Sequence, residues 1–164
     1  MLNRLLELDH ALSARLTIRR AGLLRVTAQV IAHTGDSVVW IAIGLGLWAL
    51  NQPQWAARVA ITVFTLIGLV AALKFLFRRG RPTGERGKLY LKLDAHSFPS
   101  GHAARTAALA VTCGALDPRL GLACGIWATL VCLARVALGV HYLSDVAVGA
   151  AIGIGAGAIL AALV

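Results

Sequence analysis

Apolar residues form five runs along the chain, separated by short polar stretches. A membrane-spanning helix needs about 20 apolar residues, within a range of roughly 17 to 25. Four of the runs meet this length, and the third meets it only if its helix starts in the headgroup region. The pattern predicts an all-α integral-membrane helical bundle of about five transmembrane helices, at residues 26–50, 55–77, 101–116, 120–138 and 146–164.

Two features modify the start of this pattern. Leucines recur near helical spacing in the first 25 residues, but Glu7 and Asp9 interrupt the apolar stretch that a signal peptide requires. We therefore expect an interfacial amphipathic segment over 1–25, followed by one membrane-embedded domain, so that a single domain covers 1–164. The Gly35-Asp36-Ser37 break is expected to divide the first run, with Asp36 capping the helix that follows.

Five crossings place the polar connections alternately on the two membrane faces. The N-terminal segment, the loop 78–100 and the connection 139–145 fall on one face, and 51–54 and 117–119 fall on the other with the C-terminus. Polar residues in the first three segments are therefore expected to meet in one site.

The last run carries a GxxxGxxxG pattern at Gly149, Gly153 and Gly157. Small residues at this spacing let a second helix approach closely. The partner helix belongs either to the same bundle or to another protomer, so a homo-oligomer through this face is one of two alternatives.

Composition and charge agree with a membrane protein. Hydrophobic residues make up 59% of the chain, charged residues make up 14%, and mean hydropathy is +0.77. A soluble domain is nearer 25% charged, and a disordered chain has low hydrophobicity. The net charge of +9 lies in clusters between apolar runs. This placement differs from the polar basic surface of a nucleic-acid reader, so no nucleic-acid partner is expected.

Several ionisable residues lie inside the apolar runs or at their ends. Such a residue costs about 2.5–3.5 kcal/mol on insertion scales and is a functional candidate by default. Lys74 and Arg81 lie two turns apart, on one face if the helix continues, and Arg135 lies near the end of the fourth run. In Pro99-Ser100-Gly101-His102, we expect Pro99 in the first turn of the third helix, whose N-terminal amides could bind an anion.

A second histidine has a carboxylate four residues later. His141 and Asp145 have i, i+4 spacing, at which the carboxylate can fix the imidazole tautomer. Cations, helix amides and two histidines on one face are what phosphoryl transfer requires. A zinc site is the alternative, but nearby arginines would repel a divalent cation and no third close ligand is evident.

These residues resemble the three-part signature of the type 2 phosphatidic acid phosphatases, a superfamily that includes vanadium haloperoxidases and bacterial acid phosphatases. The motifs are Lys74-x6-Arg81-Pro82, Pro99-Ser100-Gly101-His102 and Arg135-x5-His141-x3-Asp145, and they cover residues 74–145. One departure is Ala134, where the family usually has serine before the arginine. This change removes one hydroxyl contact.

The resemblance implies a metal-independent lipid phosphatase that forms a phosphohistidine and needs no cofactor. His141 would be the nucleophile, Asp145 would orient it, and His102 would be the general acid. The remaining motif residues would bind the phosphoryl oxygens, namely Lys74, Arg81, Ser100, Gly101 and Arg135.

Two other functions are considered beside this one. A non-enzymatic membrane protein that binds or transports an anion or phospholipid could use the same cations, but it would not need two histidines and Asp145. Haloperoxidase relatives are typically larger and soluble. The lipid candidates are phosphatidic acid, phosphatidylglycerophosphate, polyprenyl diphosphates and polyprenyl phosphosugars, with a preference for the polyprenyl lipids.

Charge bias predicts the orientation of the chain in a bacterial plasma membrane. The motif face carries Arg4, Arg15, Arg19, Arg20 and Arg25, whereas the other face carries Arg58 and Arg119. The positive-inside rule then places the site on the cytoplasmic face.

Residues outside the motifs have weaker assignments. Arg105 either reaches the pocket or pairs with headgroups, and His96 either lines the entrance or is solvated. His10 and His33 have no partner that the sequence identifies. A solvated basic loop is expected from Arg78, Arg79, Arg86, Lys88 and Lys92.

Overall fold

The computed structural model describes residues 2–82 and 96–163, and these residues contain seven α-helices and no strand. The all-α prediction is confirmed. Arg86, Lys88 and Lys92 lie outside the described residues. The helices are α1 (Leu2–Leu16), α2 (Leu23–Thr34), α3 (Ser37–Ala49), α4 (Pro53–Phe77), α6 (Gly101–Gly114), α7 (Pro118–Ala137) and α8 (Leu143–Leu163).

Three helices are long and apolar enough to cross a membrane, namely α4, α7 and α8. The first apolar run forms α2 and α3, which bend by 52° at their junction and together could make a fourth crossing. The sequence thus located the break correctly at Gly35 and Asp36. Asp36 is the N-cap residue of α3, as expected, but its carboxylate makes no capping bond and instead contacts two histidines.

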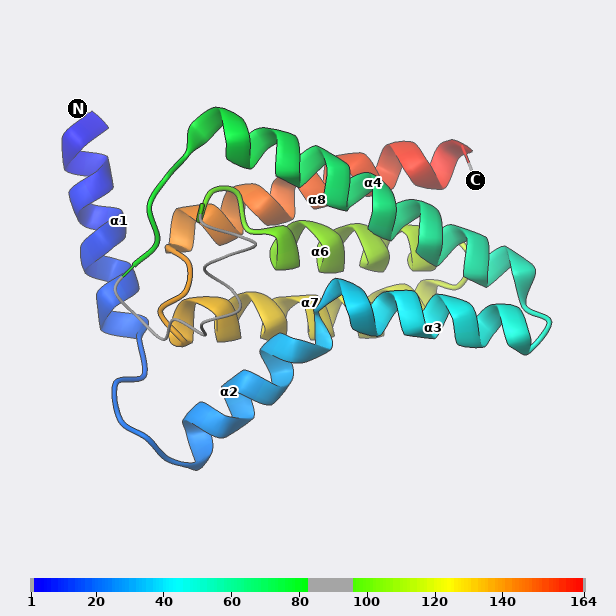
Figure 1. The fold of residues 1–164 in the computed structure, drawn as a ribbon, viewed down its shortest axis with the longest axis horizontal. Coiled ribbons are helices and arrows are strands. Elements are labelled where there is room, and N and C mark those ends of the chain that lie inside the picture. Colours follow the sequence, from blue (N-terminus) through cyan, green and yellow to red (C-terminus); the bar gives the residue numbers. More distant parts are fainter. Residues whose placement is uncertain (1, 83–95, 164) are drawn as a thin grey trace.

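The third run forms α6, which has 14 residues and is too short to span by itself. The fifth crossing therefore stays a prediction. α6 lies at the centre of the bundle and packs against α4, α7 and α8 (Figure 1). Near its C-terminal end, the buried Arg58 of α4 donates from Nη1 to the Thr112 carbonyl at 3.1 Å. This bond satisfies a carbonyl that would otherwise lack a partner at the end of a short buried helix.

The glycine pattern of α8 is used within the chain. A Cβ atom on Gly149 would lie 2.6 Å from the Ser100 carbonyl oxygen, and one on Gly153 would lie 2.1 Å from the Ala104 carbonyl oxygen. All three glycines of the pattern are buried. Gly149, Gly153 and Gly157 thus pack against α6 of the same chain, which is the first of the two alternatives.

The N-terminal segment is helical over α1 and lies across one end of the bundle (Figure 1). Leu5, Leu8 and Leu16 of this helix are more than half exposed. Two of its polar side chains face the bundle: Ser13 is buried and accepts a hydrogen bond from the Leu143 amide at 2.9 Å, and Asp9 accepts one from the Ser144 amide at 3.0 Å. The helix therefore docks by polar contacts and presents apolar side chains outward, as an interfacial helix does.

The described parts of the three polar segments meet at this end of the bundle, as expected. Arg79 forms ion pairs with Asp9 of α1 and Asp145 of α8, and its carbonyl accepts from the Ser97 amide. The α3–α4 turn and the C-terminus lie at the opposite end (Figure 1). The topology thus gathers polar residues from distant parts of the chain at one end.

Candidate active site

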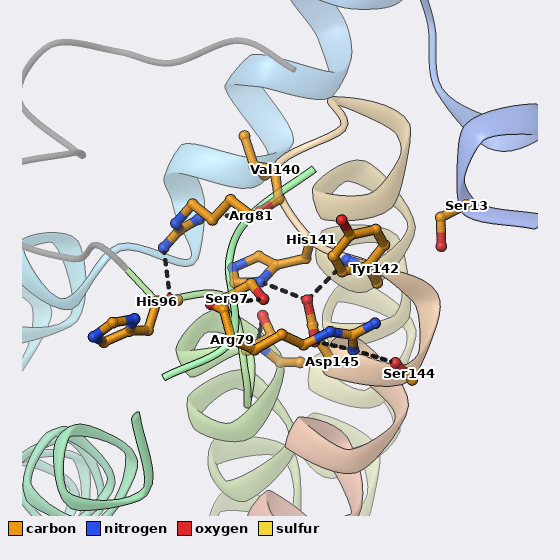
Figure 2. Close-up of polar contacts among 12 residues, drawn as sticks. Ser13, Arg79, Arg81, His96, Ser97, Val140, His141, Tyr142, Ser144 and Asp145 are labelled. Carbon is orange, nitrogen blue, oxygen red and sulfur yellow. Dashed lines mark hydrogen bonds and ion pairs between the residues drawn. The ribbon is translucent and has the colours of Figure 1, made fainter. Parts of the chain in front are cut away.

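His141 and Asp145 form the centre of the site (Figure 2). His141 lies in the connection between α7 and α8 and is 1% exposed, while Asp145 lies in the first turn of α8 and is fully buried. The Nδ1 atom of His141 is 3.6 Å from Oδ2 of Asp145, which is longer than a hydrogen bond. The i, i+4 spacing thus brings the two side chains together although the helix starts only at Leu143.

Three bonds hold this start of α8 in place. The Asp145 carboxylate accepts from the Tyr142 amide at 2.9 Å and from Nη1 of Arg79 at 2.7 Å. The Asp145 carbonyl accepts from the Ser100 amide at 2.9 Å. Ser100 is the N-cap of α6, so this last bond ties the start of α6 to the start of α8.

The Pro99-Ser100-Gly101-His102 motif opens α6 as predicted, with one difference. Ser100 caps the helix and its side chain accepts from the Ala103 amide, so Pro99 precedes the cap and is not in the first turn. Gly101 is the first helical residue, and His102 follows it as a largely buried side chain. The Nε2 atom of His102 is 2.6 Å from Oδ1 of Asp36.

The motif cations approach His141 from three segments. α4 ends at Phe77, so the continuous helix that would join Lys74 to Arg81 is not formed. Both cations nevertheless donate to the His96 carbonyl, Lys74 at 3.1 Å and Arg81 at 3.3 Å (Figure 2 draws the Arg81 bond). Arg135 is buried near the end of α7.

These charges act on the His141 imidazole. Burial lowers the pKa of His141 well below its ordinary value, and the positive charge of Arg135 lowers it further. Arg81, Lys74 and His102 act in the same direction. A neutral imidazole keeps a nitrogen lone pair, so the surroundings favour a nucleophile held beside cations that can bind an oxyanion.

The comparisons with known proteins agree with this geometry. Residues 55–164 match the family model of the PAP2 superfamily. The chain is 34% identical over 156 residues to the decaprenylphosphoryl-5-phosphoribose phosphatase of Mycobacterium tuberculosis, a match that covers 87% of this chain and 81% of the relative. The corresponding enzyme of Mycolicibacterium smegmatis is 33% identical, with 79% and 73% covered. The chain belongs to the PAP2 superfamily.

Two solved structures share the fold of this PAP2 protein. The transmembrane PAP2-type phosphatidylglycerolphosphate phosphatase from Bacillus subtilis has a TM-score of 0.75 and 25% identity, with 98% of this chain and 84% of that chain covered. LpxE of Aquifex aeolicus has a TM-score of 0.75 and 27% identity, with 92% of each chain covered.

Family membership confirms the resemblance found in the motifs. The protein is an integral-membrane PAP2 lipid phosphatase, and the mechanism general to this family passes through a phosphohistidine. The alternative of a non-enzymatic anion carrier is set aside because the relatives are phosphatases. For the zinc alternative, no group of three His, Cys, Asp or Glu side chains placed to hold a metal occurs within 2–82 and 96–163.

Sequence reasoning misassigned Arg79 in this PAP2 protein. It was expected in a solvated basic loop, but its guanidinium lies over the Tyr142 ring at 4.2 Å and bonds Asp9, Ser144 and Asp145. The neighbouring Arg78 is exposed, as expected. Nothing in the local Arg78-Arg79-Gly80-Arg81 pattern separates the two arginines, since the difference comes from contacts with α1 and α8.

Asp36 was also missed as a site residue. The rule applied to Lys74 and Arg135, that a charge inside an apolar run is a functional candidate, would have selected it. Arg105 is buried beside His102 and donates from Nε to the Gly35 carbonyl at 3.2 Å, which favours the first of its two expected roles. His33 contacts Asp36, and His10 stacks on Tyr142 with ring centroids 4.4 Å apart.

Proposed function

We propose that this enzyme removes a phosphate monoester from the polar headgroup of a polyprenyl-linked lipid, within the single domain 1–164. His141 is the nucleophile, Asp145 orients it and His102 is the general acid. The phosphoryl oxygens are bound by Lys74, Arg81, Ser100, Gly101 and Arg135. The observation that carries this assignment is that Lys74 and Arg81 share the His96 carbonyl while Arg81 also donates to the Val140 carbonyl, which directly precedes the buried His141.

The bond changes follow from the two histidines. Because Nδ1 of His141 faces Asp145, the lone pair on Nε2 attacks phosphorus. The P–O bond to the lipid breaks as His102 gives a proton to the leaving oxygen, and an N–P bond to His141 forms. Water then attacks phosphorus with His102 as the base, which releases inorganic phosphate and restores both imidazoles.

The cations act on the charge of the transferred group. A phosphoryl group carries its charge on three equatorial oxygens in the transition state, so catalysis depends mostly on positioning and on electrostatic stabilisation. Lys74 and Arg81 already bind one backbone carbonyl oxygen, that of His96, and Arg135 adds a positive charge from α7. These contacts support an oxyanion site beside Nε2.

The size and lining of an adjacent cavity support a headgroup larger than phosphate. A cavity of about 510 Å³ lies beside His141 and Tyr142 and is bounded by α1 and α2. A water molecule takes about 30 Å³, so the cavity has ample room for a sugar. Its polar wall consists of His10, Ser13, Thr17, Arg19 and Arg25. Hydroxyl and guanidinium groups suit a hydroxylated, phosphate-linked headgroup such as the one named in the mycobacterial relatives.

The test is phosphate release by purified enzyme in detergent micelles with EDTA present. We expect the largest kcat/KM on decaprenylphosphoryl-5-phosphoribose, followed by phosphatidic acid, phosphatidylglycerophosphate and undecaprenyl diphosphate. His141→Ala should lower release by at least about 10³-fold, while Thr129→Ala on the exposed face of α7 should leave it unchanged. A preference for a glycerophospholipid would refute the substrate assignment, and activity in His141→Ala would refute the nucleophile.

The proposed location is the plasma membrane of a bacterium, with the site on the cytoplasmic face. Support comes from the distribution of arginines. Arg58 is buried and donates to the Thr112 carbonyl, so Arg119 is the only exposed arginine among the described residues of the opposite end. In a cysteine-free background, Arg20→Cys should react with an impermeant thiol reagent only in opened cells. Gln52→Cys should react in intact cells. The reverse pattern would place the site outside the cytoplasm.

A further inference from the structure

The Asp36 carboxylate lies between two imidazoles at the junction of α2 and α3. Its Oδ1 atom is 2.6 Å from Nε2 of His102, and its Oδ2 atom is 2.8 Å from Nδ1 of His33. Asp36 has the backbone position of a helix cap, yet its side chain makes no capping bond. The carboxylate thus contacts two histidines and does not cap the helix that it precedes.

The helix break is shaped around His102. A Cβ atom at Gly35 would lie 3.1 Å from Cδ2 of His102 and 3.0 Å from Cγ1 of Val131, closer than ordinary contacts. Arg105 lies on α6 three residues after His102 and donates to the Gly35 carbonyl from two nitrogens. Two side chains of α6 therefore hold the α2–α3 junction: Arg105 binds the Gly35 carbonyl, and His102 binds the Asp36 carboxylate. These contacts place the carboxylate against the His102 imidazole.

We propose that Asp36 is a positioning residue for proton transfer by His102. The inference rests on the proposed role of His102 as general acid. A carboxylate on Nε2 orients the ring and assigns the proton transfer to Nδ1, much as a carboxylate orients the base of a serine-protease triad. As the P–O bond to the lipid breaks, the proton on Nδ1 passes to the leaving oxygen.

The charges around His102 explain why a carboxylate is needed. Burial of the ring disfavours its protonated form most, Arg135 of α7 and Arg105 of α6 repel a proton on it, and His141 faces it from the α7–α8 connection. Asp36 is the acidic group that acts in the opposite direction, by its charge and by its hydrogen bond. The acid form of His102 therefore depends on Asp36.

The experiment compares two phosphate esters that differ in their leaving groups. The leaving group of dodecyl phosphate is an alkoxide that must be protonated. The leaving group of 4-nitrophenyl phosphate is a stable phenolate that needs no proton. In Asp36→Asn we expect kcat/KM on dodecyl phosphate, which reports the steps up to release of the alcohol, to fall about 10- to 100-fold. The kcat/KM on 4-nitrophenyl phosphate should change less than about threefold, because its first product leaves without a proton. The alkaline limb of the pH–rate profile on dodecyl phosphate should move to lower pH.

The matched control is Asp117→Asn. Asp117 is also an N-cap aspartate, but it caps α7 with its side chain at the opposite end of the bundle and should leave kcat unchanged. If Asp36→Asn does not fold, Asp36→Ser removes the charge while retaining a residue suited to the cap, and the same two esters are compared.

The results separate this proposal from the proposed function. Equal losses on both esters, with an unmoved pH profile, would show a merely structural role for Asp36 and overturn the inference. Unchanged kcat/KM on dodecyl phosphate would also overturn it. A failure of the proposed function would appear differently, as retained activity in His141→Ala or as a wild-type enzyme that releases no phosphate from either ester.

Discussion

Gly153 tests whether close approach of α8 to α6 sets the geometry of the site. In Gly153→Ala the new Cβ would lie 2.1 Å from the Ala104 carbonyl oxygen and 2.9 Å from the Ala104 Cα. Both atoms are backbone, so a rotamer change cannot relieve the overlap. Because ordinary contact begins near 3.4 Å, α8 must move away from α6 by about 1.3 Å.

The magnitude follows from two opposing effects. Overpacking a close contact costs about 1–3 kcal/mol, whereas Gly→Ala in a helix gains about 1 kcal/mol. Gly155→Ala is the matched control, since Gly155 lies two residues later on α8 and an added Cβ there would have no atom within 4 Å. Gly155→Ala therefore gains helix stability without an overpacking penalty. We therefore expect the free energy of unfolding of Gly153→Ala to be about 2 kcal/mol below that of Gly155→Ala, roughly 4 to 8 °C in Tm.

The same shift should impair catalysis. Asp145 begins α8, and its carbonyl accepts from the Ser100 amide at the start of α6, so separating the helices strains the link between the two histidine motifs. A displacement of about 1 Å can cost about 10²-fold in rate. The assay is thermal unfolding in detergent together with kcat for phosphate release. Equal Tm and kcat in the two alanine variants would refute the reasoning.

Three further predictions concern the ion pairs of Arg79 with Asp9 and Asp145 and the oxyanion site. Arg79→Lys should lower the free energy of unfolding by about 2 kcal/mol and should lower kcat at least tenfold, because lysine cannot reach both carboxylates. Arg78→Lys is the control and should match wild type in the same melts and kinetics. Although burial raises the pKa of Asp9, hydrogen bonds from Ser144 and Arg79 leave it below its ordinary value. The stabilising effect of Asp9 is therefore complete above the ordinary pKa and is lost as pH falls through the lowered pKa. Melts of Asp9→Asn and wild type should differ at pH 7 and converge as the pH falls below that lowered pKa. Vanadate, which mimics pentacoordinate phosphorus, should inhibit competitively, and inhibition that does not weaken with added substrate would contradict the proposed oxyanion site.

The motif residues could be found in the sequence because each motif is local. Lys74 lies near the end of one apolar run, Ser100 and His102 open another, and Asp145 follows His141 by four positions. Apolar periodicity and capping are encoded within one or two helical turns, so helix positions and the polar ends of helices can be predicted from short segments. The same reasoning located the α2–α3 break and the shared end of the polar segments.

The contacts of Arg79 and Asp36 could not be predicted in this way. Arg79 meets Asp145, and Asp36 meets His102, across 66 residues of chain in each case. Such pairs depend on how the helices pack, which in turn depends on close contacts such as that of Gly153 with Ala104. A pattern within one segment contains no information about the partner that packing brings to it. Local sequence thus specified the motif residues, and the packing of α4, α7 and α8 around α6, with α1 against α7 and α8, decided which carboxylates and cations contact them.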